Sequence, residues 1–129
     1  MKKMILATAF AALGTAALAD PAAGVWQTEP GDTGGYLHVA IAPCGASICG
    51  TIKDAFDKNG AIQPDYEHKG KKMIWDMNAD GNGSYSGGKI WAPDSDKTYN
   101  SKMLLSGNTL VVKGCVAFLC RTRIWPAAN

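Results

Sequence analysis

Four cysteines, Cys44, Cys49, Cys115 and Cys120, form two pairs with the spacing C-x4-C. Paired cysteines either bridge as disulfides or bind a metal. Structural zinc sites usually have the shorter C-x2-C spacing and occur in reducing compartments. The spacing therefore favours disulfides, which persist in exported proteins.

A second motif, from Asp76 to Gly81, matches the start of a calcium loop, with oxygen donors at Asp76, Asn78 and Asp80. The twelfth position is Gly87 and not Glu, and the flanking segments predict strands instead of helices. A turn explains the same composition, because Asp, Asn and Gly tolerate positive φ. We expect a turn and keep calcium binding as the alternative.

Catalytic motifs are missing from the sequence. His38 and His68 are the only histidines, and no G-x-S-x-G, H-E-x-x-H or phosphate-binding glycine loop occurs. His38 is expected outside the sheet and His68 in a lysine-rich loop. We therefore predict a binding protein without enzymatic activity and without a cofactor.

The first 19 residues predict the cellular location. Lys2 and Lys3 precede an apolar run that ends in Ala17-Leu18-Ala19, as in a secretory signal peptide cleaved after Ala19. The run is shorter than the ~20 residues that span a membrane, so we expect no retained anchor. The protein is expected to be exported, to the periplasm or the medium.

Residues 20–129 predict a single neutral domain. Two of the 13 Lys and Arg residues lie before Asp20, so the remaining cations equal the 11 acids in number. Because no basic excess is left to neutralise phosphates, nucleic acid is not an expected partner. The 15 glycines and repeated turn motifs favour an all-β fold over a helical bundle.

Alternating side chains between turn signals predict about eight antiparallel strands that close, or nearly close, into a small barrel. The loop from Asp54 to Lys72 has room for one helical turn. The expected strands cover residues 25–28, 36–42, 47–53, 73–76, 89–92, 98–105, 110–115 and 119–125.

Side-chain parity separates an apolar inner face from an outer face that carries the cysteines. Cys44 and Cys49 then face each other across one hairpin, and Cys115 and Cys120 across another, within disulfide range. A bridge between the two hairpins remains the alternative. The expected inner residues are Leu37, Val39, Ile41, Ile48, Ile52, Tyr99, Met103, Leu110 and Val112.

Several motifs in one order resemble a family of small exported bacterial proteins, domain of unknown function 2147. They are Gly24-x-Trp26, Gly34-Gly35-Tyr36, Cys44-Gly45-x-x-x-Cys49-Gly50, Gly87-Gly88-x-Ile90 with Pro93 and Tyr99, and Gly114-Cys115 with Cys120 and Trp125. The resemblance implies a lipocalin-like barrel, in which a basic residue stacks on the tryptophan of the opening G-x-W. In this sequence it implies that Gly24, Trp26 and either Arg121 or Arg123 close one end of the barrel.

The expected function is to bind a small apolar or amphipathic molecule inside the barrel. The candidate ligand-binding residues are the inner residues above, Leu110 excepted, together with Arg121 and Arg123, which could meet an anionic head group. Pairing of an arginine with Glu29 or Asp76 is the structural alternative. The mouth is expected near residues 30–34 and 54–72. A protein partner, such as a lytic enzyme or protease held by Tyr36, Tyr85, Trp91 and Tyr99, is the second hypothesis.

Overall fold

Eight antiparallel strands form one continuous sheet in the computed structural model, which describes residues 20–128. Each strand pairs with its neighbours in chain order, β2 to β9. Every strand expected from the sequence is present. The bounds are β2 Gly24–Gln27, β3 Tyr36–Cys44, β4 Ser47–Phe56, β5 Lys72–Gly81, β6 Ser84–Ala92, β7 Lys97–Ser106, β8 Thr109–Val116 and β9 Leu119–Pro126.

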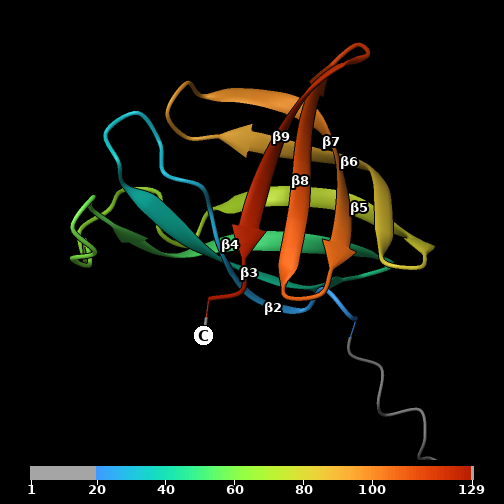
Figure 1. Ribbon diagram of the computed structural model, residues 1–129, viewed down its shortest axis with the longest axis horizontal. Helices are drawn as coiled ribbons and strands as arrows, with labels where there is room; N and C mark the ends of the chain where they lie inside the picture. The colour runs from blue at the N-terminus through green and yellow to red at the C-terminus, as the bar shows by residue number, and fades with distance from the viewer. Residues whose placement is uncertain (1–19, 129) are drawn as a thin grey trace, which may run out of the picture.

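The sheet curls through 244° into a nearly closed barrel. Figure 1 shows β8 and β9 lying across β3, β4 and β5, so that the two halves of the curled sheet face each other. The first and last strands meet only at a corner, where Trp26 bridges to Ala127 and the Ala128 N–H donates to the Val25 carbonyl at 2.9 Å. The chain ends therefore close the barrel with few backbone hydrogen bonds.

The β5–β6 hairpin occupies the segment in which we expected a turn resembling a calcium loop. Asp76, Asn78 and Asp80 belong to β5 and are exposed. The turn is at Asn82-Gly83, both with positive φ, and Asn-Gly is the dipeptide that two-residue hairpin turns prefer. The expectation of a turn at residues 76–81 is therefore wrong, and the structure extends both strands.

Between β4 and β5, residues 57–71 form turns and one bridge, between Phe56 and Ile62. The helical turn expected in this loop is absent from the described residues. None of the described residues forms a helix long and apolar enough to cross a membrane. The expected signal peptide, residues 1–19, lies outside the described residues.

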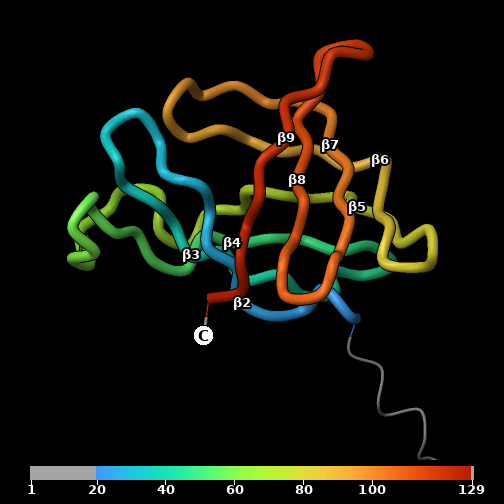
Figure 2. Tube along the Cα trace, in the orientation of Figure 1, coloured from blue at the N-terminus to red at the C-terminus, as the bar shows by residue number. Residues whose placement is uncertain are grey.

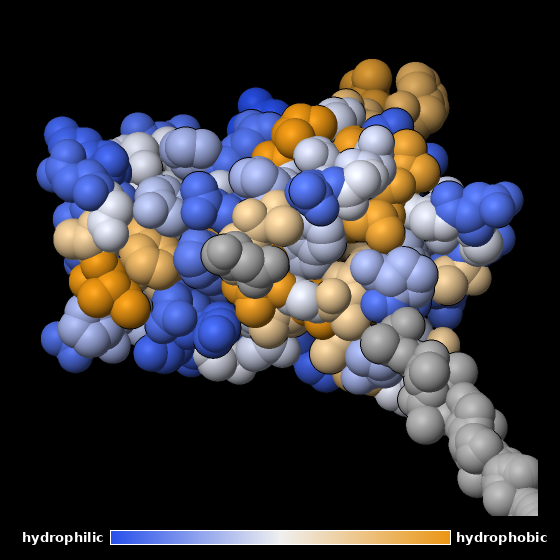
Figure 3. All heavy atoms as spheres, turned by 60° about the horizontal axis from the view of Figure 1, so that its bottom comes forward, coloured by the Kyte–Doolittle hydropathy of each residue, from blue (hydrophilic) through white to orange (hydrophobic). Residues whose placement is uncertain are grey.

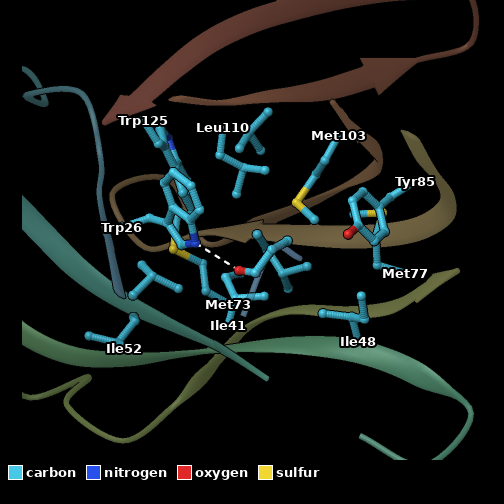
Figure 4. Close-up of a cluster of buried hydrophobic side chains, with 14 residues drawn as sticks. Trp26, Ile41, Ile48, Ile52, Met73, Met77, Tyr85, Met103, Leu110 and Trp125 are labelled. Carbon is cyan, nitrogen blue, oxygen red and sulfur yellow. Dashed lines mark hydrogen bonds between the residues drawn. The ribbon is translucent and has the colours of Figure 1, made fainter. Parts of the chain in front are cut away.

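The apolar core fills one end of the barrel. Figure 4 shows Met77, Tyr85, Met103 and Ile48 packed at that end, with Trp26 and Trp125 farther along the interior. The Trp26 indole N–H donates to the Ala22 carbonyl at 2.9 Å, which satisfies the polar atom of this buried ring. The side chains below 2% exposure are Ile52, Ile74, Met77, Leu110, Val39 and Val112.

Both predicted disulfides are present, Cys44–Cys49 and Cys115–Cys120. Each spans a hairpin, so the alternative of a bridge between hairpins is wrong. Cys49 and Cys115 are buried, but neither belongs to the core cluster of the barrel. The bridges hold the two hairpins in register from outside the core.

A candidate ligand-binding cleft

An open cleft of about 1040 Å³ occupies the end of the barrel opposite the packed core. Its rim is formed by the β2–β3 loop, the β4–β5 loop and the β6–β7 turn, which come together on the left in Figure 2. The first two are the loops at which the sequence placed the mouth. The volume matches the upper range of small-molecule sites, so the cleft is large enough for a small organic ligand.

Apolar side chains line the deep part of the cleft. Met73, Val112 and Trp125 are buried at its floor, and Leu37 and Ile90 are partly buried beside them. Aromatic residues from four strands and one loop add to the walls: Tyr36, Phe56, Tyr66, Trp91 and Tyr99. This lining favours a ligand with an apolar or aromatic part.

Glu29 joins the rim of the cleft to β9. Its carboxylate accepts a hydrogen bond from the Ile124 N–H at 2.6 Å and another from the Arg123 guanidinium at 3.1 Å. The backbone N–H of Ile124 lowers the pKa of Glu29, and the Arg123 contact acts in the same direction against the opposing effect of burial. The positive charge of Arg123 is thus compensated by the carboxylate of Glu29.

Arg121 lines the same cleft without such a partner. It lies two residues before Arg123, on the same face of β9, opposite Gly114 of β8. In the described part of the chain it makes no ion pair. An exposed guanidinium above an apolar floor can bind a carboxylate or phosphate with two hydrogen bonds.

Trp91 is held at the edge of the cleft by several contacts. Its indole N–H donates to Asp96 at 2.8 Å, and the Lys71 ammonium lies 5.5 Å from its ring centre. The ring of His68 meets Trp91 edge-on at 5.0 Å, and the rings of Tyr66 and His68 also meet edge-on, at 5.3 Å. Burial raises the pKa of Tyr66, so its hydroxyl is a neutral donor at physiological pH.

Comparison with protein families places this chain in a bacterial group. Residues 24–126 match the family model described as uncharacterized protein conserved in bacteria, DUF2147. The chain belongs to the DUF2147 family. No curated protein gives a significant match to this family member.

A solved structure supports the fold. Protein HP1028 from the human pathogen Helicobacter pylori, described as belonging to the lipocalin family, matches with a TM-score of 0.66. The identity is 17%, and the match covers 83% of this chain and 82% of that one. This DUF2147 protein is therefore lipocalin-like in fold, as the sequence motifs implied, and such a barrel is consistent with small-ligand binding.

The residues predicted to bind a ligand divide between the two ends of the barrel. Leu37, Tyr99, Val112, Arg121 and Arg123 line the cleft. The other five are buried in the packed end and do not line it: Val39, Ile41, Ile48, Ile52 and Met103. Parity correctly predicted that all five point inward, but it carries no information about which stretch of the interior is filled.

The end closure that the resemblance implied differs from the contacts observed. Trp26 is buried in the core, and among the described residues the cation found over a tryptophan ring is Lys71 on Trp91. Arg123 instead pairs with Glu29, which was the structural alternative. The described residues therefore do not show the implied stacking of Arg121 or Arg123 on Trp26, and the guanidinium of Arg123 is bound by the carboxylate of Glu29.

The aromatic residues proposed as anchors for a protein partner have other positions. Tyr85 is 2% exposed and donates a hydrogen bond to Asp20. Tyr36, Trp91 and Tyr99 line the cleft. Tyr85 is therefore not available as a surface anchor, and the other three belong to the concave site.

Neither the residues of the alternative metal site nor the two histidines line the cleft, although His68 contacts Trp91 at its edge. The described residues contain no group of three or more His, Cys, Asp or Glu side chains arranged to hold a metal ion. His38 contacts the ring of Phe56 and hydrogen-bonds Gln27 at 3.2 Å. Burial lowers the pKa of His38.

Sequence reasoning did not select several residues that form the cleft. The clearest examples are Met73, Ile90 and Trp125, and each lies in a strand that the sequence predicts. Their apolar type was a usable signal. The strand containing Ile90 is longer than the sequence predicts, however: it covers Ser84–Ala92 in place of residues 89–92.

Proposed function

We propose that this protein binds a small amphipathic molecule in the open cleft, with the apolar part on the floor and an anionic group at Arg121. The observation that carries the proposal is an unpaired arginine at the rim of a cleft of about 1040 Å³ with an apolar floor. Burial of apolar ligand surface against Met73, Val112 and Trp125 supplies affinity. Arg121 supplies orientation and charge selectivity.

The acidic residues at the rim leave Arg121 free to act. Glu29 is neutralised by Arg123, and Asp57 accepts hydrogen bonds from the N–H groups of Asn59 and Ala61 within its own loop. Asp32 and Asp94 are exposed on loops. An anionic head group at this position would therefore pair with Arg121, whose charge no carboxylate of the described residues compensates.

We propose further that the protein acts by binding alone and after export. The cleft is lined by neither histidine, and the two disulfides support an oxidising location. N-terminal sequencing of the mature protein is expected to begin at Asp20. A chain that begins at Met1 or Lys2 would contradict export through this signal peptide.

Binding is tested first by native mass spectrometry of protein purified from its own compartment. A retained mass that disappears on denaturation is expected. The affinities for palmitic acid and for hexadecanol are then compared by displacement of a fluorescent fatty-acid analogue. We expect Arg121→Gln to weaken palmitate about tenfold and to leave hexadecanol unchanged, because the lost interaction is a charge-assisted hydrogen bond.

Lys53→Gln is the matched control, since it removes an exposed cation from β4 outside the cleft. The proposal fails if neither amphiphile binds, or if both variants weaken palmitate equally. Inhibition of lysozymes or proteases by protein that carries no ligand would instead support the protein-partner hypothesis.

A further inference from the structure

The turn between β8 and β9 has an unusual composition. The other two-residue turns are Gly45-Ala46, Asn82-Gly83 and Gly107-Asn108, and each contains a glycine. This turn is Ala117-Phe118, and Ala117 adopts a φ of +54°, a region that residues with a side chain rarely adopt. A turn that breaks local sequence preferences points to a role other than folding.

The same hairpin carries the most exposed large apolar side chains among the described residues. Phe118 is 90% exposed, Leu119 72% and Val116 62%. Figure 1 shows the hairpin projecting from the body of the barrel, and Figure 3 shows apolar side chains at the projecting top of the molecule. The Cys115–Cys120 disulfide closes the base of this tip, which limits its freedom to fold back.

Lysines lie on one side of the tip. Residues 97–126 contain five Lys and Arg residues and no Asp or Glu. Lys102 and Lys113 lie directly opposite each other on β7 and β8, a pairing of like charges that is unfavourable unless an anion compensates it. A groove of about 440 Å³ below the tip is lined by Lys89, Lys102 and Phe118, and no acidic residue is among the described residues that line it.

We propose that the β8–β9 hairpin docks this protein on an anionic lipid surface. Phe118, with Leu119 and Val116, enters the region just below the head groups, while Lys89, Lys102 and Lys113 contact the lipid phosphates. Basic residues beside apolar side chains are the combination that anionic membranes attract. A projecting tip with three large apolar side chains offers much less area than the ~800 Å² per partner of a stable protein interface.

The position of the hairpin relates this surface to the cleft. Val116, Leu119 and Arg121 also line the cleft, so docking brings the mouth close to the lipid surface. This consequence, exchange of an amphipathic ligand with the membrane, rests on the proposed function. The docking itself does not depend on it.

Docking is tested by sedimentation with vesicles of phosphatidylglycerol and phosphatidylcholine in equal parts, compared with phosphatidylcholine alone. The protein used begins at Asp20, because the apolar residues 1–19 would themselves bind lipid. We expect binding to the anionic vesicles that weakens with added salt. Phe118→Ser is expected to reduce the partition coefficient about tenfold, and the double variant Lys102→Gln, Lys113→Gln by a similar factor.

Ile62→Ser is the matched control, since Ile62 is 52% exposed on the β4–β5 loop, away from the hairpin. A further variant, Phe118→Trp, reports insertion directly. Its fluorescence is expected to shift to shorter wavelength with anionic vesicles and to be quenched by lipids brominated on the acyl chains.

Two results overturn the proposal. One is vesicle binding that is absent in the wild-type protein or that is equally strong in the wild-type protein and in Phe118→Ser. The other is a dimer that becomes a monomer with Phe118→Ser, which would assign the hairpin to contact with a second copy. Loss of palmitate affinity in Arg121→Gln with vesicle binding intact, or the reverse, separates failure of the ligand site from failure of the hairpin.

Discussion

The carboxylate of Glu29 lies 3.1 Å from the guanidinium of Arg123, although the two residues are 94 positions apart in the chain. Glu29 follows β2, the first strand, and Arg123 is in β9, the last. With the 2.6 Å hydrogen bond from the Ile124 N–H, this contact ties the two ends of the curled sheet together where backbone pairing is sparse.

Glu29→Gln is expected to lower the free energy of unfolding by about 1 kcal/mol, because both side chains of the pair are partly exposed and water screens them. The melting temperature should fall by about 5 °C. Glu67→Gln is the control, since Glu67 is exposed in its pair with His68. Equal effects of the two variants would show that Glu29 does not hold the seam.

Glu29 also makes the free energy of unfolding depend on pH. The folded pKa of Glu29 is below its ordinary value of 4.5, so its contribution to stability is present above the unfolded pKa and is lost as the pH falls through the folded pKa. Wild-type protein should therefore lose its advantage over Glu29→Gln in acid below about pH 4. Urea unfolding of both proteins from pH 3 to pH 7 measures the difference. If the difference stays constant across this range, the ionised carboxylate of Glu29 is not its source.

Two glycines distinguish the filled end of the barrel from the open one. A Cβ on Gly88 would lie 2.8 Å from the Trp75 carbonyl oxygen and 3.0 Å from the Met77 Cα, whereas on Gly114 its nearest neighbour is Ile90 at 3.5 Å. Gly88→Ala should cost about 2 kcal/mol through overpacking, and Gly114→Ala much less. Chemical denaturation measures both, and equal costs would contradict the difference in packing.

Each disulfide closes a loop of a few residues, so its removal should have a limited effect on stability. The chain-entropy model gives about 2 kcal/mol or less for Cys44→Ser with Cys49→Ser, and the same for Cys115→Ser with Cys120→Ser. Guanidinium unfolding under oxidising conditions is the measurement. Failure of either double variant to fold would show that the bridge does more than hold the register of a hairpin.

Tyr85 is expected to control stability at alkaline pH. Burial, with the hydrogen bond to Asp20 at 2.6 Å, raises its pKa to about 12. Because the folded pKa of Tyr85 is raised, its contribution to stability is fully present below the unfolded pKa of ~10. This contribution is lost as the pH rises towards 12. Ultraviolet titration should show an ionisation step near pH 12, together with unfolding. In Tyr85→Phe the late step should disappear, and its persistence would assign it to another tyrosine.

The sequence predicted the parts of this protein that depend on neighbours along the chain. Alternation of apolar residues located all eight strands, and parity with hairpin spacing paired Cys44 with Cys49 and Cys115 with Cys120. The motifs around Gly24 and Trp26 indicated the family and its lipocalin-like fold. These features follow from the period of a strand and the length of a turn, which are local.

Other expectations failed because the deciding contacts are distant in the chain. Arg123 pairs with Glu29, and not with Trp26, because curvature of the sheet brings β9 to the loop after β2. The inward residues Val39 and Ile48 lie in the filled end and Leu37 in the open one. The difference depends on where Met77, Tyr85 and Met103 meet across the barrel.

By itself, the sequence determined the strands, the direction in which their side chains point and the two disulfides, because these depend on backbone geometry within a hairpin. Only the tertiary structure decided where the barrel is hollow, which arginine is left without a carboxylate, and that Phe118 stands clear of the surface. These properties arise when the sheet curls and brings residues from opposite ends of the chain into contact, and side-chain volume then fills one end while leaving the other open.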